Sequence, residues 1–472
     1  MSSNAARLGD SPPVYRIDLS LPPAERYVEL ARAYRDKMRS LTSLFDEVVR
    51  SIHPDVNVAW VHRAARLLLR RLYTDEETEE IRGMSREVGI DMYFLVALNV
   101  LLDSLMGCTS GAARSKEDGT GNNVTKMLHF RTLDWGMDSL REMIVQLEFI
   151  RSSSSSGGSK GENKHDKKEE EDEVIATSIT YVGYVGVLTG VRKGLSLSLN
   201  FRPYHDTTGR LANFRFYASH VLVLLGLRQS ISSLLRGYII PPEPAQNWLM
   251  KWLPAKKRTQ HFPPPESLAS ITATLPQIPT TSAYLIFSDG NSTLILEKDH
   301  RSAVTLSSPS FIVVTNNDRN PPFPEPSTPG EPTAHSGLTA GLGELSTVDD
   351  LIEDSDVRLA CMQSCWDRKV RDIQSTSTRR STRSTRASTR QSMTQSLTNA
   401  PTQRNPRSSK RTPSNSPSRE DPSSNVTATA AEILEWLGIF PITNELTHFA
   451  TVMDPSEGKV VWVRRYIEPV TE

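Results

Sequence analysis

Two hydrophobic periodicities follow one another along this chain. Residues 14–21 alternate apolar and polar side chains, which is typical of a half-buried strand. From Pro23 to Ile52 the apolar residues return at three- and four-residue steps, as on one face of a helix, and Pro54 follows as a stop signal. Helical spacing continues through residues 57–73, 76–87 and 90–106. The first 107 residues are therefore predicted to form one helical unit that a strand introduces.

After Cys108 the period changes from helical to alternating. Strands are predicted at residues 126–135, 143–151, 174–183 and 195–203. A helical block at about 213–253 precedes a hairpin at 283–299, whose central "SDGN" supplies residues suited to a tight turn. The remaining predictions are a strand at 310–318, helices at 346–372 and 429–438, and a closing hairpin at 448–466. This order favours an α+β layered sandwich over a parallel α/β fold.

Three segments of biased composition interrupt this pattern. Residues 152–173 are rich in Ser, Gly and charged residues, and residues 320–345 are rich in Pro. Residues 375–425 are rich in Ser, Thr and Arg. Such compositions bury too little apolar surface to fold, so each segment is predicted to be a disordered insertion in a loop. For the third segment, a phosphorylation-tuned tether for anions or RNA is the alternative interpretation.

Composition limits the classes of partner and cofactor. The 472-residue chain is 37% hydrophobic, enough for a sizeable core, and it carries 55 basic and 55 acidic residues. Because the formal net charge is zero, no overall electrostatic field favours nucleic acid, and we expect no nucleic acid partner. Three cysteines give neither a disulfide framework nor a metal site, so no metal or other cofactor is expected. The chain as given shows no secretory signal and no membrane span, which favours a soluble, cytoplasmic protein.

Cys108 is the candidate for chemistry, because it follows the apolar run in "LLDSLMGCTSG". One interpretation is a small buried core residue, the commonest role of an unpaired cysteine. The other is a nucleophile that becomes a new N-terminus when the chain cuts itself. The freed α-amino group, with a pKa near ~8, could then take the proton of the thiol. The spacing leaves both interpretations open.

Five ordered blocks resemble the acid ceramidase and N-acylethanolamine acid amidase family. They read "CTSG", "HFRTLDWG", "YVGYVGVLTGVRKGLSLSLNFR", "VVTNND" and "HFATVMDPSEGKVVWV". "VYRIDLSLPPAERY" also resembles the start of that family's helical subunit. The family comprises cysteine N-terminal-nucleophile hydrolases, typically lysosomal or secretory. The resemblance implies an αββα sandwich with an N-terminal helical subunit, divided into a flexible tail at 1–13, a helical region at 14–107 and a catalytic region at 108–472.

The resemblance also implies roles for individual residues. Cys108 matches the nucleophile, freed by cleavage between Gly107 and Cys108, with its own amine as general base. Arg131 and Asp134, in "RTLD", match the arginine and aspartate that orient the cysteine. Without the other blocks, these two residues would be interpreted as a surface ion pair at a strand end.

Two further residues are assigned in the same way. Asn316, in "TNND", matches an asparagine whose side-chain amide donates to the oxyanion, whereas a lone Asn after a strand would be a turn residue. Arg358 matches a further active-site arginine, although helical charge is an equally good account. Phe201 stands where the family has a glutamate, and this departure bears on self-processing and on substrate choice.

The resulting hypothesis is a self-processing amidase acting on a fatty acyl amide, with ceramide as the first and an N-acylethanolamine as the second substrate. Because the substrate is a lipid, we expect the protein to contact a membrane surface. We also expect the two cleavage products to stay associated. A Gly-Cys junction resembles the isopenicillin-N acyltransferase branch, so acyl transfer is one alternative. The other alternative is an uncleaved, inactive relative that binds lipid or protein partners.

Overall fold

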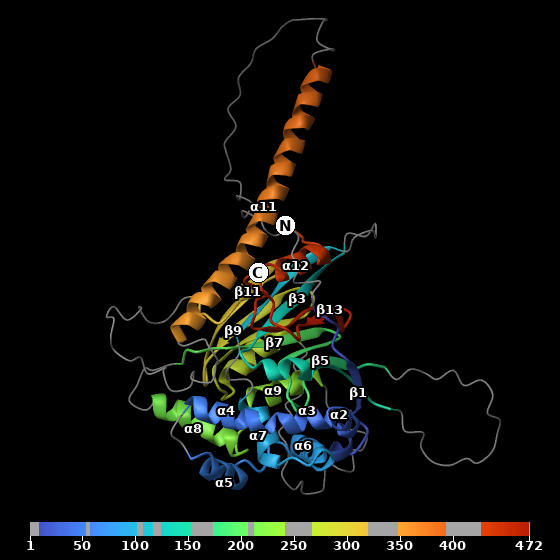
Figure 1. Ribbon diagram of the computed structural model, residues 1–472. Helices are drawn as coiled ribbons and strands as arrows, with labels where there is room; N and C mark the ends of the chain where they lie inside the picture. The colour runs from blue at the N-terminus through green and yellow to red at the C-terminus, as the bar shows by residue number, and fades with distance from the viewer. Residues whose placement is uncertain are drawn as a thin grey trace, which may run out of the picture.

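The structure, a computed structural model, describes most of the chain in nine segments (Figure 1). They span residues 9–52, 57–101, 107–116, 124–152, 173–205, 212–240, 267–319, 348–392 and 426–471. The predicted insertions at 152–173 and 320–345 lie almost entirely outside the described residues, as does 393–425 of the third insertion and 241–253 of the predicted helical block.

The N-terminal region forms a strand and a layer of helices, as the sequence predicted. The strand β1 (Val14–Asp18) leads into short helices: η1 (Pro23–Glu25), α2 (Val28–Ala33), α3 (Arg35–Ser40), α4 (Thr42–Ile52), α5 (Val58–Leu68), α6 (Asp75–Val88) and α7 (Met92–Leu101). The single helix predicted from Pro23 to Ile52 is wrong, because the backbone leaves helical geometry at Tyr27 and Tyr34. Tyr27, Leu30, Tyr34, Met38 and Leu41 are all buried, so the buried face continues across these breaks as far as Leu41.

Two sheets follow. The eight-stranded sheet has the order β1-β4-β5-β6-β7-β8-β9-β10, with β4 (Ile144–Ile150), β5 (Ala176–Tyr181), β6 (Thr189–Arg192), β7 (Leu195–Phe201), β8 (Ala283–Ser288), β9 (Thr293–Lys298) and β10 (Ala303–Ser308). The five-stranded sheet has the order β11-β2-β3-β12-β13, with β2 (Gly107–Lys116), β3 (Thr125–Asp134), β11 (Phe311–Val314), β12 (Thr447–Asp454) and β13 (Lys459–Arg465). All described neighbours pair antiparallel except β1 and β4, which pair parallel.

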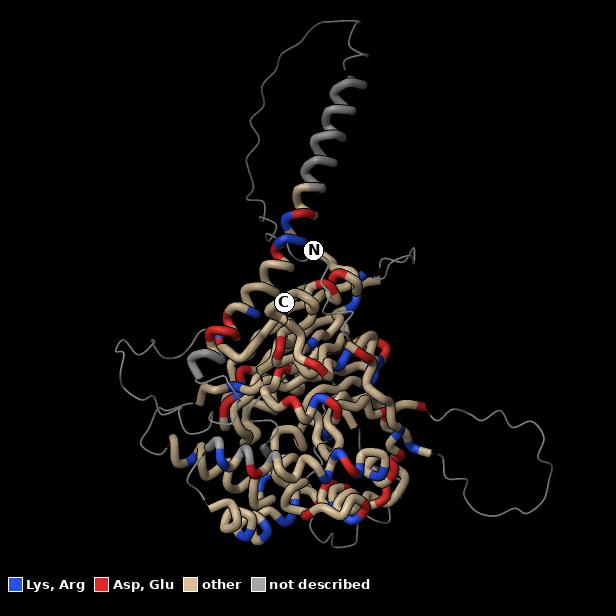
Figure 2. Tube along the Cα trace, in the orientation of Figure 1, with Lys and Arg blue, Asp and Glu red and all other residues tan. Residues whose placement is uncertain are grey.

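The sheets pack face to face between two helical layers (Figure 1). The N-terminal helices, α8 (Ala212–Leu224), α9 (Ile231–Ile239) and α10 (Leu268–Thr274) lie on the side of the eight-stranded sheet, whereas α11 (Val348–Ser392) and α12 (Ala430–Leu437) cover the five-stranded sheet. The predicted α+β fold, an αββα sandwich with a helical N-terminal region, is confirmed. Basic and acidic residues are interspersed along the trace of the folded body rather than segregated, in line with the zero net charge (Figure 2).

Two predicted boundaries need correction. Helix α11, predicted to end at 372, continues to Ser392, so residues 375–392 of the predicted disordered insertion are helical here. No Gly or Pro occurs between Ser346 and Ala400, so nothing in the backbone chemistry stops the helix. At the other end, part of the predicted flexible tail is held: the backbones of Asp10 and Arg465 exchange hydrogen bonds of 3.0 and 2.9 Å. Within the described residues, no helix is long and apolar enough to cross a membrane.

Candidate active site

Cys108 lies at the start of β2, facing the other sheet. It pairs with Leu133 of β3 and has no exposed surface. Its Sγ is 3.2 Å from Nη2 of Arg131, which donates to it, and 3.9 Å from the carbonyl oxygen of Leu199 on β7. The thiol therefore lies between the sheets, within reach of one guanidinium.

Arg131 is fixed by β6 of the facing sheet. Its Nη1 donates to the carbonyl oxygen of Leu188 and, at 2.6 Å, to Oγ1 of Thr189. Burial raises the pKa of the Cys108 thiol above its ordinary value, and the charge of Arg131 acts in the opposite direction. In the intact chain Cys108 is therefore a neutral thiol at neutral pH, with a cation in place to stabilise the thiolate when it forms.

Asn316 contacts Cys108 from the loop after β11. The backbone N–H of Cys108 donates to Oδ1 of Asn316 at 2.9 Å, and Nη2 of Arg358 donates to the same oxygen at 3.2 Å. Nδ2 of Asn316 donates to the carbonyl oxygen of Phe201 at 2.8 Å. In the intact chain the side-chain amide thus presents its oxygen, not its N–H, to Cys108, and the oxyanion role stays a prediction.

Asp134 and Arg358 form a buried ion pair on the face of β3 opposite to the one that carries Arg131. Nη1 of Arg358 lies 3.2 Å from Oδ2 of Asp134, and Oγ1 of Thr447 donates to Oδ1 at 2.7 Å. Burial raises the pKa of Asp134 to about 6, and the charge of Arg358 acts to lower it. The surface ion pair considered for Arg131 and Asp134 is wrong, because both are buried and each bonds to other partners.

The five predicted residues therefore form one buried cluster, and two supporting residues were missed. Thr447 binds Asp134, and Ser355 accepts the backbone N–H of Asn316 at 2.7 Å. Ser355 lies one turn before Arg358 on α11, a spacing that could have signalled it. Thr447 directly precedes the block "HFATVMD", and nothing in its own pattern distinguished it.

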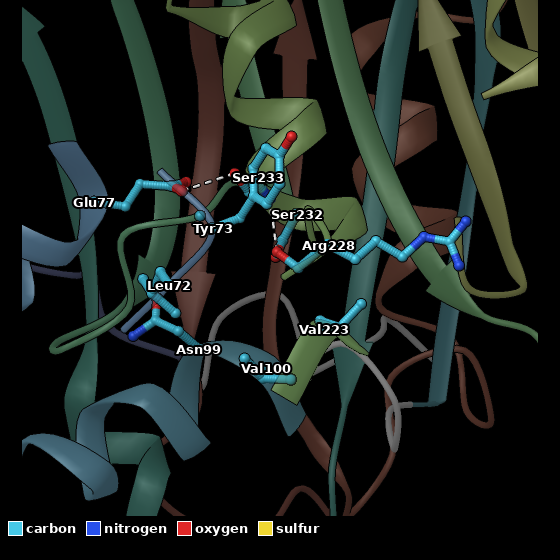
Figure 3. Close-up of a pocket in the computed structure, with 11 residues that line it drawn as sticks. Leu72, Tyr73, Glu77, Asn99, Val100, Val223, Arg228, Ser232 and Ser233 are labelled. Carbon is cyan, nitrogen blue, oxygen red and sulfur yellow. Dashed lines mark hydrogen bonds between the residues drawn. The ribbon is translucent and has the colours of Figure 1, made fainter. Parts of the chain in front are cut away.

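A separate small cavity lies in the helical layer (Figure 3). Glu77, Asn99, Arg228 and Ser233 are among its lining residues, and Glu77 accepts a hydrogen bond of 2.8 Å from Ser233. Burial raises the pKa of Glu77. None of the five predicted site residues lines this cavity, so it is not part of the Cys108 cluster.

Comparison with known proteins gives consistent similarities. A family model, the beta subunit of N-acylethanolamine-hydrolyzing acid amidase, matches residues 10–73. N-acylethanolamine-hydrolyzing acid amidase of Caenorhabditis elegans is 27% identical over 201 residues, 40% of this chain and 47% of that protein. Acid ceramidase of Rattus norvegicus is 26% identical over 205 residues, 40% of this chain and 45% of that protein. The chain therefore matches about half the length of these curated relatives.

Among solved structures, the Caenorhabditis elegans N-acylethanolamine-hydrolyzing acid amidase ortholog covers 74% of this chain and 93% of its own, at 14% identity and a TM-score of 0.35. The family model matches the region that contains "VYRIDLSLPPAERY", and these curated relatives carry the names of the family that the quoted blocks resemble. The predicted resemblance is confirmed: this chain is similar in sequence to acid ceramidases and N-acylethanolamine-hydrolyzing acid amidases.

Proposed function

We propose that this chain is a self-processing amide hydrolase that forms an acyl-enzyme on Cys108 and cleaves the N-acyl amide bond of a lipid. The observation that carries the proposal is the contact of Cys108 with both Arg131 and Asn316 inside a fully buried cluster. A core cysteine needs neither a guanidinium at its sulfur nor a side-chain acceptor at its amide. Both are useful to a nucleophile whose nitrogen becomes an amine.

Self-cleavage is the first step. Sγ of Cys108 attacks the carbonyl carbon of Gly107, the bond from that carbon to the Cys108 nitrogen breaks, and the thiol proton ends on this nitrogen. Asn316 Oδ1 already accepts the N–H of that nitrogen and is placed to hold it as it becomes an amine. Water then hydrolyses the thioester. Because Cys108 has no exposed surface in the intact chain, substrate access requires a rearrangement that follows the cut at Gly107.

Amide hydrolysis repeats this chemistry on a substrate. The free amine of Cys108 accepts the thiol proton and passes it to the leaving amine, while Arg131 stabilises the developing charge on sulfur. The Asp134–Arg358 pair holds the strand ends around the nucleophile. Water releases the acyl group as a fatty acid. The curated relatives support this substrate class, because their names specify N-acylethanolamine and, in ceramidase, ceramide.

The two fragments are proposed to stay associated after the cut. Strand β1, from the N-terminal fragment, forms the edge of the eight-stranded sheet and pairs with β4 over five residues. A buried ion pair also crosses the boundary: Arg236 of α9 donates to Glu80 of α6 through Nη1 at 2.5 Å and Nη2 at 2.7 Å. Separation would expose an unpaired sheet edge and a buried charge, both of which are costly.

Contact with a lipid surface is proposed for helices α5 and α8. Exposed apolar side chains gather there, at Trp60, Leu67, Leu68, Phe214, Tyr217, Val221 and Leu222. Both helices pack against α7, and large exposed apolar side chains on surface helices mark interaction surfaces. We expect the protein to cosediment with neutral phospholipid vesicles and the double variant Trp60→Glu, Phe214→Glu to remain in the supernatant. Equal cosedimentation of both proteins would contradict the lipid contact.

The proposed function is tested by intact mass and by product release. Wild type incubated from neutral to acidic pH is expected to yield fragments 1–107 and 108–472, whereas Cys108→Ala stays whole. Cys365→Ala is the matched control, since this second buried thiol lies against α12 rather than at the cluster. The processed protein is then expected to release fatty acid from an N-acylethanolamine or from ceramide. An intact chain under all conditions, with no fatty acid released, would favour the inactive binding relative.

A further inference from the structure

The last three residues of β7 lie beside Cys108 and Asn316. The carbonyl oxygen of Leu199 is 3.9 Å from Sγ of Cys108, and the carbonyl oxygen of Phe201 accepts a hydrogen bond of 2.8 Å from Nδ2 of Asn316. Asn200 is the residue between them, and it has no exposed surface. Because a buried amide is costly unless its polar atoms find partners, the partners of this side chain indicate its role.

The side chain of Asn200 connects the two sheets. Its Oδ1 accepts a hydrogen bond of 2.6 Å from Oγ of Ser110 on β2. Its Nδ2 donates to the carbonyl oxygens of Val314, at 3.2 Å, and of Thr315, at 3.1 Å. Ser110 and Val314 are partners in the ladder between β2 and β11, so one amide from the eight-stranded sheet binds two neighbouring strands of the five-stranded sheet.

These contacts fix the backbone that leads directly to Asn316. Strand β11 ends at Val314, and Asn200 binds the carbonyl oxygens of Val314 and of the next residue, Thr315. Ser355 of α11 also binds this loop, because it donates to Oγ1 of Thr315 at 2.8 Å and accepts the N–H of Asn316 at 2.7 Å. The loop is therefore held from β7 and from α11 immediately before the Asn316 side chain.

We propose that Asn200 is a positioning residue for self-cleavage, which acts through Asn316. By holding the end of β11, it keeps Oδ1 of Asn316 at a hydrogen-bond distance of 2.9 Å from the backbone nitrogen of Cys108. The catalytic consequence rests on the proposed function, in which this nitrogen becomes the amine of the nucleophile. The geometric consequence, the placement of Asn316 by Asn200, is testable in a chain that does not cleave.

Ser110 sets the orientation of the Asn200 amide. Its hydroxyl donates to Oδ1, which directs the Nδ2 group at the two carbonyl oxygens. If the amide turned over, its oxygen would face two carbonyl oxygens and would be repelled. A fully bonded, buried side chain of this kind specifies one arrangement of the strands it joins. Such precision matters here, because a displacement of about 1 Å at a reacting group can cost about 100-fold in rate.

The test removes the donor and retains the shape of the side chain. Asn200→Asp keeps an acceptor for Ser110 but leaves at most one donor, the protonated carboxyl, for two carbonyl oxygens. We expect self-cleavage, followed by intact mass over time, to slow by about tenfold or more. In the uncleaved Cys108→Ala background, we expect faster hydrogen–deuterium exchange in the peptide that contains residue 108, because its N–H loses a well-placed acceptor.

Asn99→Asp is the matched control, because Asn99 is bonded in the same way within the helical layer. It is 3% exposed, its Nδ2 donates to the carbonyl oxygens of Leu95 at 2.9 Å and Gly183 at 2.8 Å, and its Oδ1 accepts the N–H of Val185 at 2.8 Å. The same chemical change there is expected to lower the urea midpoint of unfolding to a similar extent. It leaves the contacts of β11 in place, so cleavage and exchange at residue 108 should stay close to those of the wild type.

A second variant keeps the inference testable if Asn200→Asp does not fold. Ser110→Ala removes the hydroxyl that orients the Asn200 amide, and it should change both measurements in the same direction by a smaller amount. Equal cleavage rates and equal exchange at residue 108 in the Asn200 and Asn99 variants overturn the positioning role. If the wild type does not cleave, the proposed function fails, and exchange at residue 108 then decides by itself whether Asn200 places Asn316.

Discussion

The backbone nitrogen of Cys108 donates to the side-chain oxygen of Asn316 across 208 positions of sequence, at 2.9 Å. Arg358 donates to the same oxygen from a third element, α11. One acceptor thus joins β2, the loop after β11 and α11 at the atom where the chain is proposed to be cut.

Removing the Asn316 acceptor should slow self-cleavage. Asn316→Ala leaves the Cys108 N–H and the Arg358 guanidinium without their shared partner, and we expect the rate of fragment formation to fall by roughly 100-fold, a typical loss for one preorganised polar group. The rate is followed by intact mass over time. Asn317→Ala, which changes the next residue and bonds to α11 instead, should cleave close to the wild-type rate. Equal rates in the two variants would exclude a role for this acceptor.

Thr447 should tune the titration of Asp134. Thr447→Val removes the hydroxyl that donates to Oδ1, and loss of a hydrogen bond to a carboxylate raises its pKa above the present value of about 6. The pH profile of kcat/KM for the processed enzyme is expected to shift upward by about one unit. Thr447→Ser retains the hydroxyl and should restore the wild-type profile. A Ser variant that behaves like the Val variant would point to packing rather than to the hydrogen bond.

Asp134 should make the folded chain less stable as the pH rises. Its pKa is about 6 in the fold against an ordinary value of 3.8, so between these values the folded state binds a proton that the unfolded state lacks. Stability from this group is fully present below about pH 4 and is lost as the pH rises through about 6, a change of about 3 kcal/mol. The measurement is urea unfolding at pH 4 and pH 7 in the uncleaved Cys108→Ala background. Adding Asp134→Asn should remove this difference, and a persistent difference would assign it to other groups.

The ion pair between the two fragments should be costly to break. Glu80→Gln leaves Arg236 buried beside a neutral amide, and we expect unfolding at neutral pH to become easier by about 3 kcal/mol or more. The processed fragments of this variant should also separate at lower urea concentration, as judged by size-exclusion chromatography. Glu76→Gln is the control, since Glu76 is 37% exposed and its loss should cost under about 1 kcal/mol. Similar losses in both variants would argue against Glu80 as the main link.

Local pattern was sufficient for most of the secondary structure. The alternation of apolar and polar residues at 143–151 predicted β4. At 283–299 two short apolar runs on either side of the turn residues "SDGN" predicted β8 and β9, which are buried on both faces. Strand β2 was missed since its "GCTSGAARSK" has small side chains without alternation. It is covered by a sheet on one face and a helix on the other, so burial on both faces removes the pattern.

The amino-acid pattern was enough to predict the layered α+β fold and to single out Cys108, and the resemblance of the ordered blocks added four further candidate site residues. Which of these candidates contact one another is known only from the packed structure. Arg131 and Asp134 are three apart in sequence, yet they point to opposite faces of β3 and serve different partners, one Cys108 and the other Arg358. The orientation of Asn316 likewise depends on Phe201 and Ser355. Periodicity predicts only which residues of one helix or strand share a face. The hydrogen-bond partners of the site residues lie on other elements, which come together only when the sheets and helices pack.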